Sequence, residues 1–203
     1  MSEKINNNEH PYVDLGLPSG TLWATKNVGA RKPSDYGLYF QWGDTSGYTA
    51  DQIGKGKQFN WDNYKWSKNG SSSNFSKYTV TGATLDLEDD AANANMGGDW
   101  HMPTPEQCQE LIDNTTSEWT TQDGVNGRLF TSTKDISKSI FVPAAGYASN
   151  GSLYSVGNEA DVWSSALHTY YVVNGRYLNF NSGSVNLNYG SRCCGFSVRG
   201  VLG

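Results

Sequence analysis

Residues 85–115 read LDLEDDAANANMGGDWHMPTPEQCQELIDNT, and this stretch contains both of the helices that the sequence predicts. The first helix is expected over 85–97, a run rich in Ala and acidic residues. It is expected to end at Gly97 and Gly98, because glycine favours the left-handed backbone that terminates helices. The rest of the chain is expected to form short strands, turns and irregular backbone.

The second helix is expected over 104–115, directly after the segment WHMPT. Thr104 is suited to the N-cap position and Pro105 to the first helical position. Glu106 falls in the first turn, where the helix dipole favours a carboxylate. An apolar face would be formed by Cys108, Leu111 and Ile112.

Short strands separated by turns are predicted on both sides of this helical stretch. They are expected as two strands within 12–30 around a Pro-Gly turn, one within 35–45, and one each in GRLFTS (127–132), KSIFVPAAGY (138–147) and DVWSSA (161–166). Residues 46–82 are rich in Gly, Ser, Asn and Lys and are expected to form a long surface excursion, pinned by Trp61, Tyr64 and Trp66. The predicted fold class is α+β, with two helices, short mixed β-sheets and much irregular loop. Residues 1–11 are expected to be disordered, and 12–203 to form one domain.

Composition excludes several broad functions. The 203 residues carry a net charge of −5, which argues against a nucleic-acid partner or a membrane-surface role. No apolar run approaches the roughly 20 residues that cross a bilayer, so direct membrane insertion is not expected. The first residues, MSEKINNNEHPY, lack the apolar core of a secretory signal peptide.

Motifs of catalysis and metal binding are missing from the sequence. The three histidines are His10, His101 and His168, and none falls in a catalytic or metal-ligand spacing. Cys193 and Cys194 are adjacent, so they are interpreted as free thiols rather than as a disulfide framework. The chain is therefore not expected to be an enzyme or to need a cofactor.

One acidic run leaves a structural calcium site open. Asp86, Glu88, Asp89 and Asp90 offer hard oxygen ligands but lack the alternation of an EF-hand loop. The alternative is a solvated helix face.

The C-terminal segment Ser164 to Arg199 uses a restricted alphabet rich in Asn, Tyr, Ser and Gly, and its only charged residues are arginines. Within it, YLNFNSGSVNLNY (177–189) alternates with period two across a Ser-Gly turn, which predicts a half-buried hairpin. One face, called the apolar face below, would contain Leu178, Phe180, Val185 and Leu187. The other, called the polar face, would contain Tyr177, Asn179, Asn181, Ser184, Asn186 and Asn188. The apolar face would anchor the hairpin, and the polar face would be free to change.

Several segments occur in an order that resembles a known bacterial domain. They are YVDLGLPSGTLWATKNVGA, DYGLYFQWGDT, residues 85–113, SIFVPAAGY, DVWSSA and GFSVRGV, and together they span roughly residues 12–201. The chain resembles the major paralogous domain first named in Fibrobacter and common in gut Bacteroidetes. That domain belongs to the C-type lectin-like and formylglycine-generating-enzyme superfamily. A subset of these domains are variable proteins of diversity-generating retroelements, in which the C-terminal part of the fold is rewritten by adenine-directed mutagenesis.

The resemblance implies a test that composition alone can supply. Randomising the adenines of an AAC codon reaches most amino acids, but never Lys, Glu, Gln, Met or Trp. Residues 1–163 contain 33 residues of these five types, so the last 40 residues would hold about eight (33/163 × 40), and they hold none. The remaining alphabet suits a binding surface, because Tyr supplies rigid contact area and Ser, Gly and Asn supply adaptable hydrogen bonds.

The resemblance therefore implies a receptor-binding or adhesin-like display protein with a variable region over about 164–196. Its ligand-binding positions are expected to be Leu167, His168, Tyr170, Tyr171, Asn174, Arg176, Tyr177, Asn179, Asn181, Ser184, Asn186, Asn188, Tyr189, Ser191, Cys193, Cys194 and Phe196. Tyrosines are the expected energetic anchors, since aromatic residues dominate interface hot spots. The expected partner is a protein or glycan on a cell surface. The expected display site is a phage virion or a bacterial cell surface, and an oligomer would strengthen weak binding through avidity.

Two alternatives remain open from the sequence. One is an invariant carbohydrate-binding or structural surface module of the same fold. The other is an oxidase of the formylglycine-generating type, although that branch uses a pair of separated cysteines, whereas Cys193 and Cys194 are adjacent.

Overall fold

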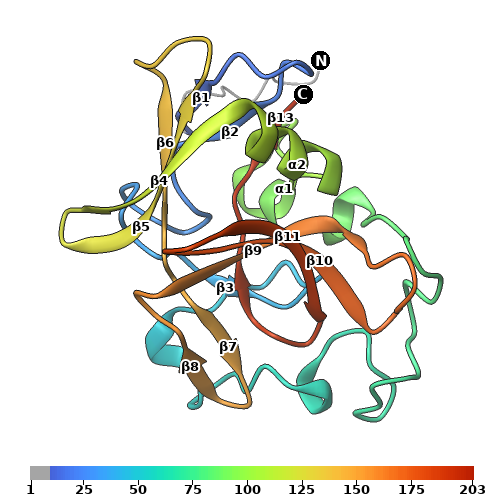
Figure 1. Ribbon diagram of the computed structural model, residues 1–203. Coiled ribbons are helices and arrows are strands. Elements are labelled where there is room, and N and C mark those ends of the chain that lie inside the picture. The colour runs from blue at the N-terminus through green and yellow to red at the C-terminus, as the bar shows by residue number, and fades with distance from the viewer. Residues whose placement is uncertain (1–9) are drawn as a thin grey trace, which may run out of the picture.

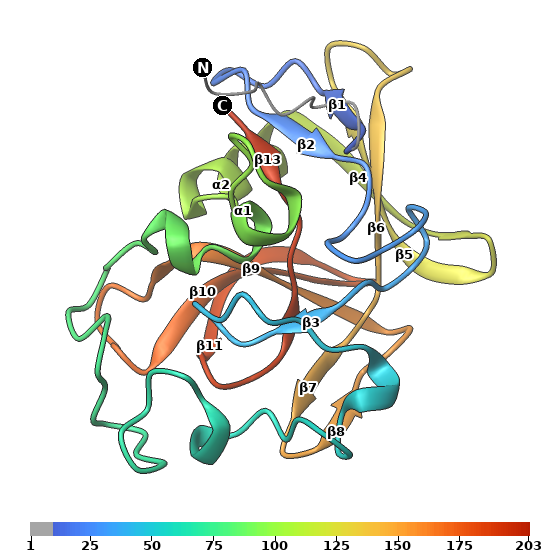
Figure 2. The same cartoon turned by 180° about the vertical axis from the view of Figure 1, so that it is seen from behind.

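The computed structural model describes residues 10–203 as a mostly β structure with two short helices and several small sheets (Figures 1 and 2). The segment 1–11, which is expected to be disordered, lies mainly outside the described residues. The last two residues of this segment contact the fold: the ring of His10 lies edge-on to Trp100, and the Pro11 carbonyl accepts a hydrogen bond from the Thr25 amide. No helix within 10–203 has the length and apolar character needed to span a membrane.

A small antiparallel sheet joins the two ends of the chain. It consists of β1 (Tyr12–Asp14), β2 (Leu22–Ala24) and β13 (Val201–Leu202), in that order. The two strands predicted within 12–30 are thereby confirmed. Figure 1 shows this sheet at the opposite end of the molecule from the hairpin of β7 (Tyr147–Ser149) and β8 (Ser152–Tyr154).

A five-stranded mixed sheet forms the centre of the molecule. Its order is β11 (Val185–Ser191), β10 (Asn174–Asn181), β9 (Glu159–Leu167), β12 (Phe196–Ser197) and β3 (Tyr39–Phe40). Only the β9–β12 pair is parallel. The strand expected over 35–45 is limited to the two residues of β3, because Gly37 and Gly43 adopt positive φ on either side of it.

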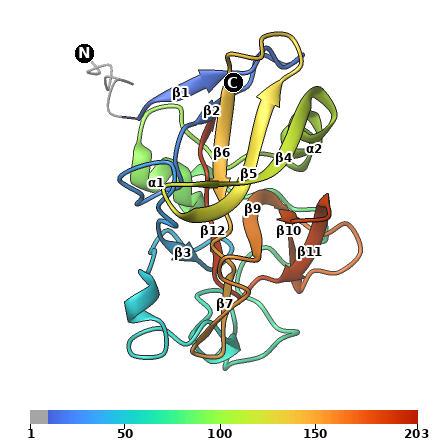
Figure 3. The same ribbon diagram turned by 60° about the vertical axis from the view of Figure 1, so that its left-hand side comes forward.

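A third sheet is built from β4 (Thr115–Gln122), β5 (Val125–Ser132) and β6 (Ser139–Pro143). Asp123 and Gly124 both have positive φ, as a tight hairpin between β4 and β5 requires. Figure 3 shows β5 and β6 running beside each other above the central sheet. The strands predicted at 127–132 and within 138–147 correspond to β5 and β6, whereas β4 was not predicted.

Helix α1 (Ala91–Met96) is shorter than the predicted helix over 85–97. Leu87–Asp89 form a separate 3-10 turn, and the carboxylate of Asp90 caps α1 by accepting the Asn93 amide. A cap at Asp90 starts a new helix there, so the preceding residues cannot belong to it. The predicted stop is confirmed, since Gly97 has a φ of 73°.

Helix α2 (Pro105–Asn114) follows the prediction closely. The Thr104 hydroxyl accepts the Gln107 amide, the Gln107 side chain accepts the Thr104 amide, and Pro105 opens the helix. Cys108 and Leu111 are buried, and Ile112 packs at the edge of the same core. The N-terminus of α2 therefore contains a complete capping box, which commonly stabilises a helix by about 1 kcal/mol.

The main core lies between α2, the central sheet and the β4–β5–β6 sheet. Cys108 and Leu111 pack with Leu178 and Phe180 of β10, and Phe130 lies edge-on to Phe180. A second cluster includes Trp42, Trp163 and Phe196 on the other side of the central sheet. The central sheet is thus covered on both sides along β9 and β10.

Residues 46–82 form the predicted surface excursion, with only the short 3-10 turns Ala50–Gln52 and Trp61–Asn63 as helices. The Tyr64 hydroxyl donates to the Trp42 carbonyl at 2.9 Å, and the Trp66 indole donates to the Gly43 carbonyl at 2.9 Å. Two of the three predicted aromatic anchors therefore tie the excursion to the end of β3.

Candidate ligand-binding surface

The segment 164–196 forms one contiguous side of the central sheet. It runs from the end of β9 through the loop 168–173, β10, the turn at 182–184, β11 and the loop 192–195. Figure 1 shows these orange and red elements lying together, with β11 at the edge of the sheet. Residues expected to vary are therefore neighbours in space as well as in sequence.

The register of the β10–β11 hairpin keeps the two predicted faces apart. Leu178 is paired with Leu187, whereas Asn179 is paired with Asn186. Directly paired residues share a face of a sheet, so apolar residues lie opposite apolar ones and polar residues opposite polar ones. The predicted alternation is confirmed.

The apolar face holds the hairpin to the core. Leu178 and Phe180 are fully buried, and Val185 and Leu187 pack against the same cluster. Burying a side chain of this size contributes about 1.5–3 kcal/mol. The edge strand β11 is thus fixed by two side chains, while its polar residues Asn186 and Asn188 are exposed.

The expectation that the whole polar face is exposed is wrong for β10. Tyr177 and Asn179 are buried, because β10 lies inside the sheet and its polar face is covered. The Tyr177 ring meets Trp163 and Phe196 edge-on, at centroid distances of 5.8 and 4.7 Å. The remaining polar-face residues, Asn181 and Ser184 beside the turn, are half-buried.

Four rings from the loop 168–173 and the edge strand gather on the surface. We call His168, Tyr170, Tyr171 and Tyr189 the aromatic patch. Tyr170, Tyr171 and Tyr189 are 80%, 55% and 47% exposed, which is unusual for such large side chains. The His168 ring stacks on Tyr171 at 5.2 Å and lies 4.2 Å from Tyr189. The patch is thus a preassembled apolar surface of rigid rings.

His168 organises the loop that carries this patch. Its Nδ1 accepts the backbone amides of Tyr170 and Tyr171, both at 3.2 Å. Nδ1 must be unprotonated to accept them, so the neutral ring carries its proton on Nε2. Desolvation, together with the positive charge of Arg176, lowers the pKa of His168. The histidine therefore acts as a neutral scaffold for the two tyrosines.

A small groove borders the aromatic patch on the side of α2. It has a volume of about 140 Å³ and is lined by Gly82, Thr84, Pro105, Glu106, Ala166, Leu167, Thr169 and Arg176. Arg176 is paired across the hairpin with Tyr189, so it connects the patch to the groove. Asn174 and Ser191, paired at the same end of the hairpin, are half-buried.

Besides Asn179, four of the expected ligand-binding residues have buried side chains, so the expectation that they face a ligand is wrong. These are Leu167, Tyr177, Cys193 and Phe196. Leu167 and Phe196 pack in the cluster around Trp163, and Cys193 packs with Tyr64 and Phe75. Cys194 is half-buried.

The neighbouring Arg192 is also fully buried. Its guanidinium lies 3.6 Å from the Phe75 ring centroid and donates to the Tyr78 carbonyl at 2.9 Å. This arginine anchors the loop 192–195 to the excursion 46–82.

Sequence reasoning missed two carboxylates that lie next to the polar face. Glu159 and Asp161 occur on β9, and the Asn179 side-chain amide donates to both, at 2.7 Å each. Burial raises the pKa of Asp161 to about 7, and the charge of Glu159 raises it as well. The sequence did contain a pattern that could have revealed them. Glu159, Asp161 and Trp163 are spaced two residues apart, which places their side chains on one face of a strand.

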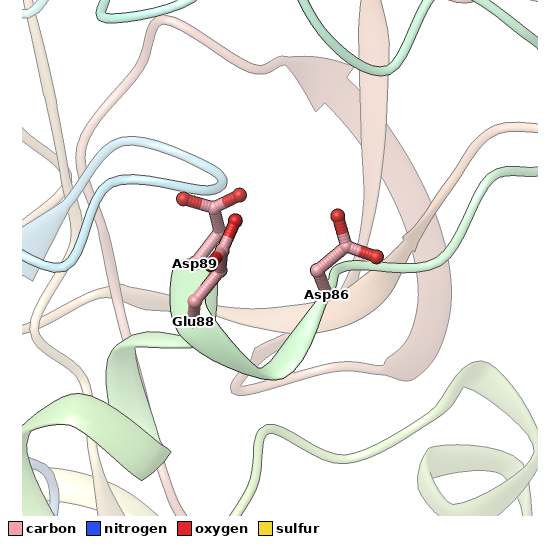
Figure 4. Close-up of side chains that lie close together, drawn as sticks. All are labelled: Asp86, Glu88 and Asp89. Carbon is pink, nitrogen blue, oxygen red and sulfur yellow. The ribbon is translucent and has the colours of Figure 1, made fainter.

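The acidic run does not form a solvated helix face. Figure 4 shows the carboxylates of Asp86, Glu88 and Asp89 gathered around one turn. The Lys77 ammonium lies among them, 2.7 Å from Asp86, 3.0 Å from Glu88 and 2.5 Å from Asp89. A calcium ion would have to displace this lysine.

Comparison with protein-family models, with curated proteins and with solved structures finds no match for this chain.

Proposed function

We propose that this protein is a ligand-binding display protein with a C-type lectin-like fold, and that retroelement-directed adenine mutagenesis diversifies its C-terminal surface. Two short helices, a small sheet that joins both chain ends and long irregular loops are compatible with that fold. The ligand would be a protein or glycan on a cell surface, bound from a phage virion or a bacterial cell surface.

One observation carries the proposal. Within 164–196, exposed side chains occur on both faces of the edge strand β11, the aromatic patch beside α2 and Asn186 and Asn188 on the opposite face, while interleaved apolar side chains are held in the core. Substitution at exposed positions usually costs under about 0.5 kcal/mol, so these side chains could change without unfolding the protein. The absence of Lys, Glu, Gln, Met and Trp from the last 40 residues is a second, independent support.

We propose a narrower set of positions that contact ligand, chosen by exposure of their side chains. Tyr170, Tyr171, Asn186, Asn188 and Tyr189 have the most accessible side chains among the predicted positions. Leu167, Cys193 and Phe196 are assigned to the scaffold, because their side chains pack in the interior.

Sequencing tests the proposal. The gene is read from sibling cells or phages, and the adjoining DNA is searched for a reverse transcriptase and a near-copy of the segment that encodes 164–196. Differences concentrated in the codons of the exposed positions support the proposal. Codons that stay constant while silent sites elsewhere differ would instead favour an invariant surface module.

The oxidase alternative has its own test. It predicts that replacing Cys193 and Cys194 by Ser abolishes a thiol-oxidising activity. Because the Cys193 side chain is buried among Tyr64 and Phe75, we propose that Cys193 is not catalytic.

A further inference from the structure

Asp161 is a buried carboxylate without a cationic partner. Its side chain is 3% exposed, and neither Asp161 nor Glu159 forms an ion pair with any residue of the described range 10–203. The Asn179 amide donates to one oxygen, Oδ1, and no other side-chain donor within 10–203 reaches the carboxylate. An ionised carboxylate in this position loses solvation that the protein itself does not replace.

Three tyrosines line the same corner of the sheet. The ring of Tyr147 stacks on Tyr154 at 5.3 Å, and Tyr154 is 44% exposed. Burial raises the pKa of Tyr147 and of Tyr177, and the nearby charges of Glu159 and Asp161 raise both further. The geometry places these groups together: the Gly146 amide, next to Tyr147, donates to the Glu159 carbonyl at 2.7 Å, and Tyr147 and Tyr177 both pack edge-on against Phe196.

Carboxylates beside aromatic faces favour an organic cation. An ammonium or guanidinium is attracted to ring faces and forms charge-assisted hydrogen bonds with carboxylates. The corner is also next to the variable hairpin, because Asn179 is paired with the exposed Asn186. A ligand that lies on β11 could therefore reach Glu159 with a long side chain.

We propose that Glu159 and Asp161, held by Asn179 and flanked by Tyr147, Tyr154 and Tyr177, form a subsite for a lysine or arginine side chain of a protein partner. This inference rests on the proposed function, because it assigns a ligand class to a corner beside the exposed asparagines of β11. Glu159 is half-buried and makes the first contact, and Asp161 supplies the second charge from beneath it.

Binding of a cation should depend on pH in a defined direction. A bound cation favours ionised Asp161, so affinity should increase as pH rises from 6 to 8, through the Asp161 pKa of about 7. The other titratable groups that face Asp161 are Glu159, Tyr147, Tyr177 and Cys194. The Cys194→Ser variant removes the thiol and leaves the Asp161 carboxylate. If Asp161 causes the pH dependence, the affinity of this variant for the cation should still increase from pH 6 to 8.

The test uses Nα-acetyl-lysine amide and Nα-acetyl-arginine amide as probes and Nα-acetyl-norleucine amide as the neutral control. Titrations are followed through the NMR signal of the Asn179 side-chain amide. Saturable shifts are expected with the two cationic probes and not with norleucine. Glu159→Gln should weaken binding about tenfold, because it removes one of two charges, while the exposed Glu118→Gln should leave affinity within about twofold. Asp161→Asn should remove the pH dependence.

The proposal is overturned if neither cationic probe gives a saturable shift, if norleucine binds equally well, or if Glu159→Gln binds the probes as tightly as wild type. Saturation by glucosamine or Ca²⁺ in place of the amino-acid probes would also overturn it. Gene sequencing reports separately on diversification. A diversified gene without probe binding contradicts only the cation subsite, and an invariant gene with probe binding contradicts only the proposed function.

Discussion

The ring of His168 lies 4.2 Å from the ring of Tyr189, although one residue precedes β10 and the other lies on the edge strand β11. The contact joins the loop 168–173 to the hairpin, and Nδ1 of the same histidine holds the amides of Tyr170 and Tyr171. An exposed surface of tyrosines is thereby given a fixed geometry. Preorganisation of this kind lowers the entropic cost of binding a ligand.

Exposed and buried tyrosines of the variable region should differ sharply in their effect on stability. Tyr170→Ala should change the free energy of unfolding by under about 0.5 kcal/mol, because its ring is exposed. Tyr177→Ala should cost about 3–5 kcal/mol, because it leaves a cavity beside Trp163 and Phe196. Urea denaturation measures both, and equal losses would contradict the division into replaceable surface and scaffold.

His168 should titrate below the ordinary value of 6.5, because desolvation and Arg176 disfavour its charged form. A histidine whose pKa is lowered by folding adds stability above the unfolded pKa, and this stability is lost as pH falls below 6.5. An NMR titration of the imidazole carbons measures the pKa directly. Arg176→Gln should move it upward, and a wild-type value at or above 6.5 would contradict the assigned environment.

Asp161 should make the protein less stable at high pH. Its folded pKa of about 7 exceeds the unfolded value of 3.8, so the folded state holds the proton more tightly and stability declines as pH rises between these values. Asp161→Asn should therefore increase the free energy of unfolding at pH 8 by about 1 kcal/mol or more, with little change at pH 4. Urea denaturation at the two pH values checks this, and an equal effect at both would argue against a raised pKa.

The Lys77 ammonium should stabilise the three carboxylates of Asp86, Glu88 and Asp89 in place of a metal ion. Lys77→Met leaves Asp86, Glu88 and Asp89 without their shared partner, so the melting temperature should fall and Ca²⁺ should restore part of it. The wild-type melting temperature should not respond to Ca²⁺. Lys68→Met, at an exposed site of the same excursion, is the matched control and should behave as wild type. A Ca²⁺-dependent rise in wild type would show that an ion can displace the lysine.

The features that were predictable from sequence are those that depend on neighbours along the chain. Helix α2 could be predicted because Thr104 and Pro105 mark its N-terminus locally. The alternation of the hairpin and its apolar anchors Leu178 and Leu187 could be predicted for the same reason. Helix α1 was predicted too long. An Asp that caps a helix and an Asp within its first turn look the same in sequence, so the start of α1 at Asp90 could not be distinguished from the acidic residues before it.

The burial of individual site residues could not be predicted, because it depends on strand order. Alternation marks Tyr177 and Asn186 as equivalent, yet β10 is an inner strand and β11 is the edge. Glu159 lies close to Asn179 only through the β9–β10 register, and Tyr147 comes from a separate hairpin. Such contacts join distant segments, and no local pattern specifies them.

The most direct test of the central claim is deep sequencing of the codons for residues 164–196 in sibling cells or phages. Substitutions at template adenines should accumulate in the codons of Tyr170, Tyr171, Asn186, Asn188 and Tyr189, while those of Leu178, Phe180, Val185 and Leu187 stay constant. A substitution rate over 164–196 no higher than over 1–163, or equal variation at exposed and buried codons, would contradict a diversified binding surface.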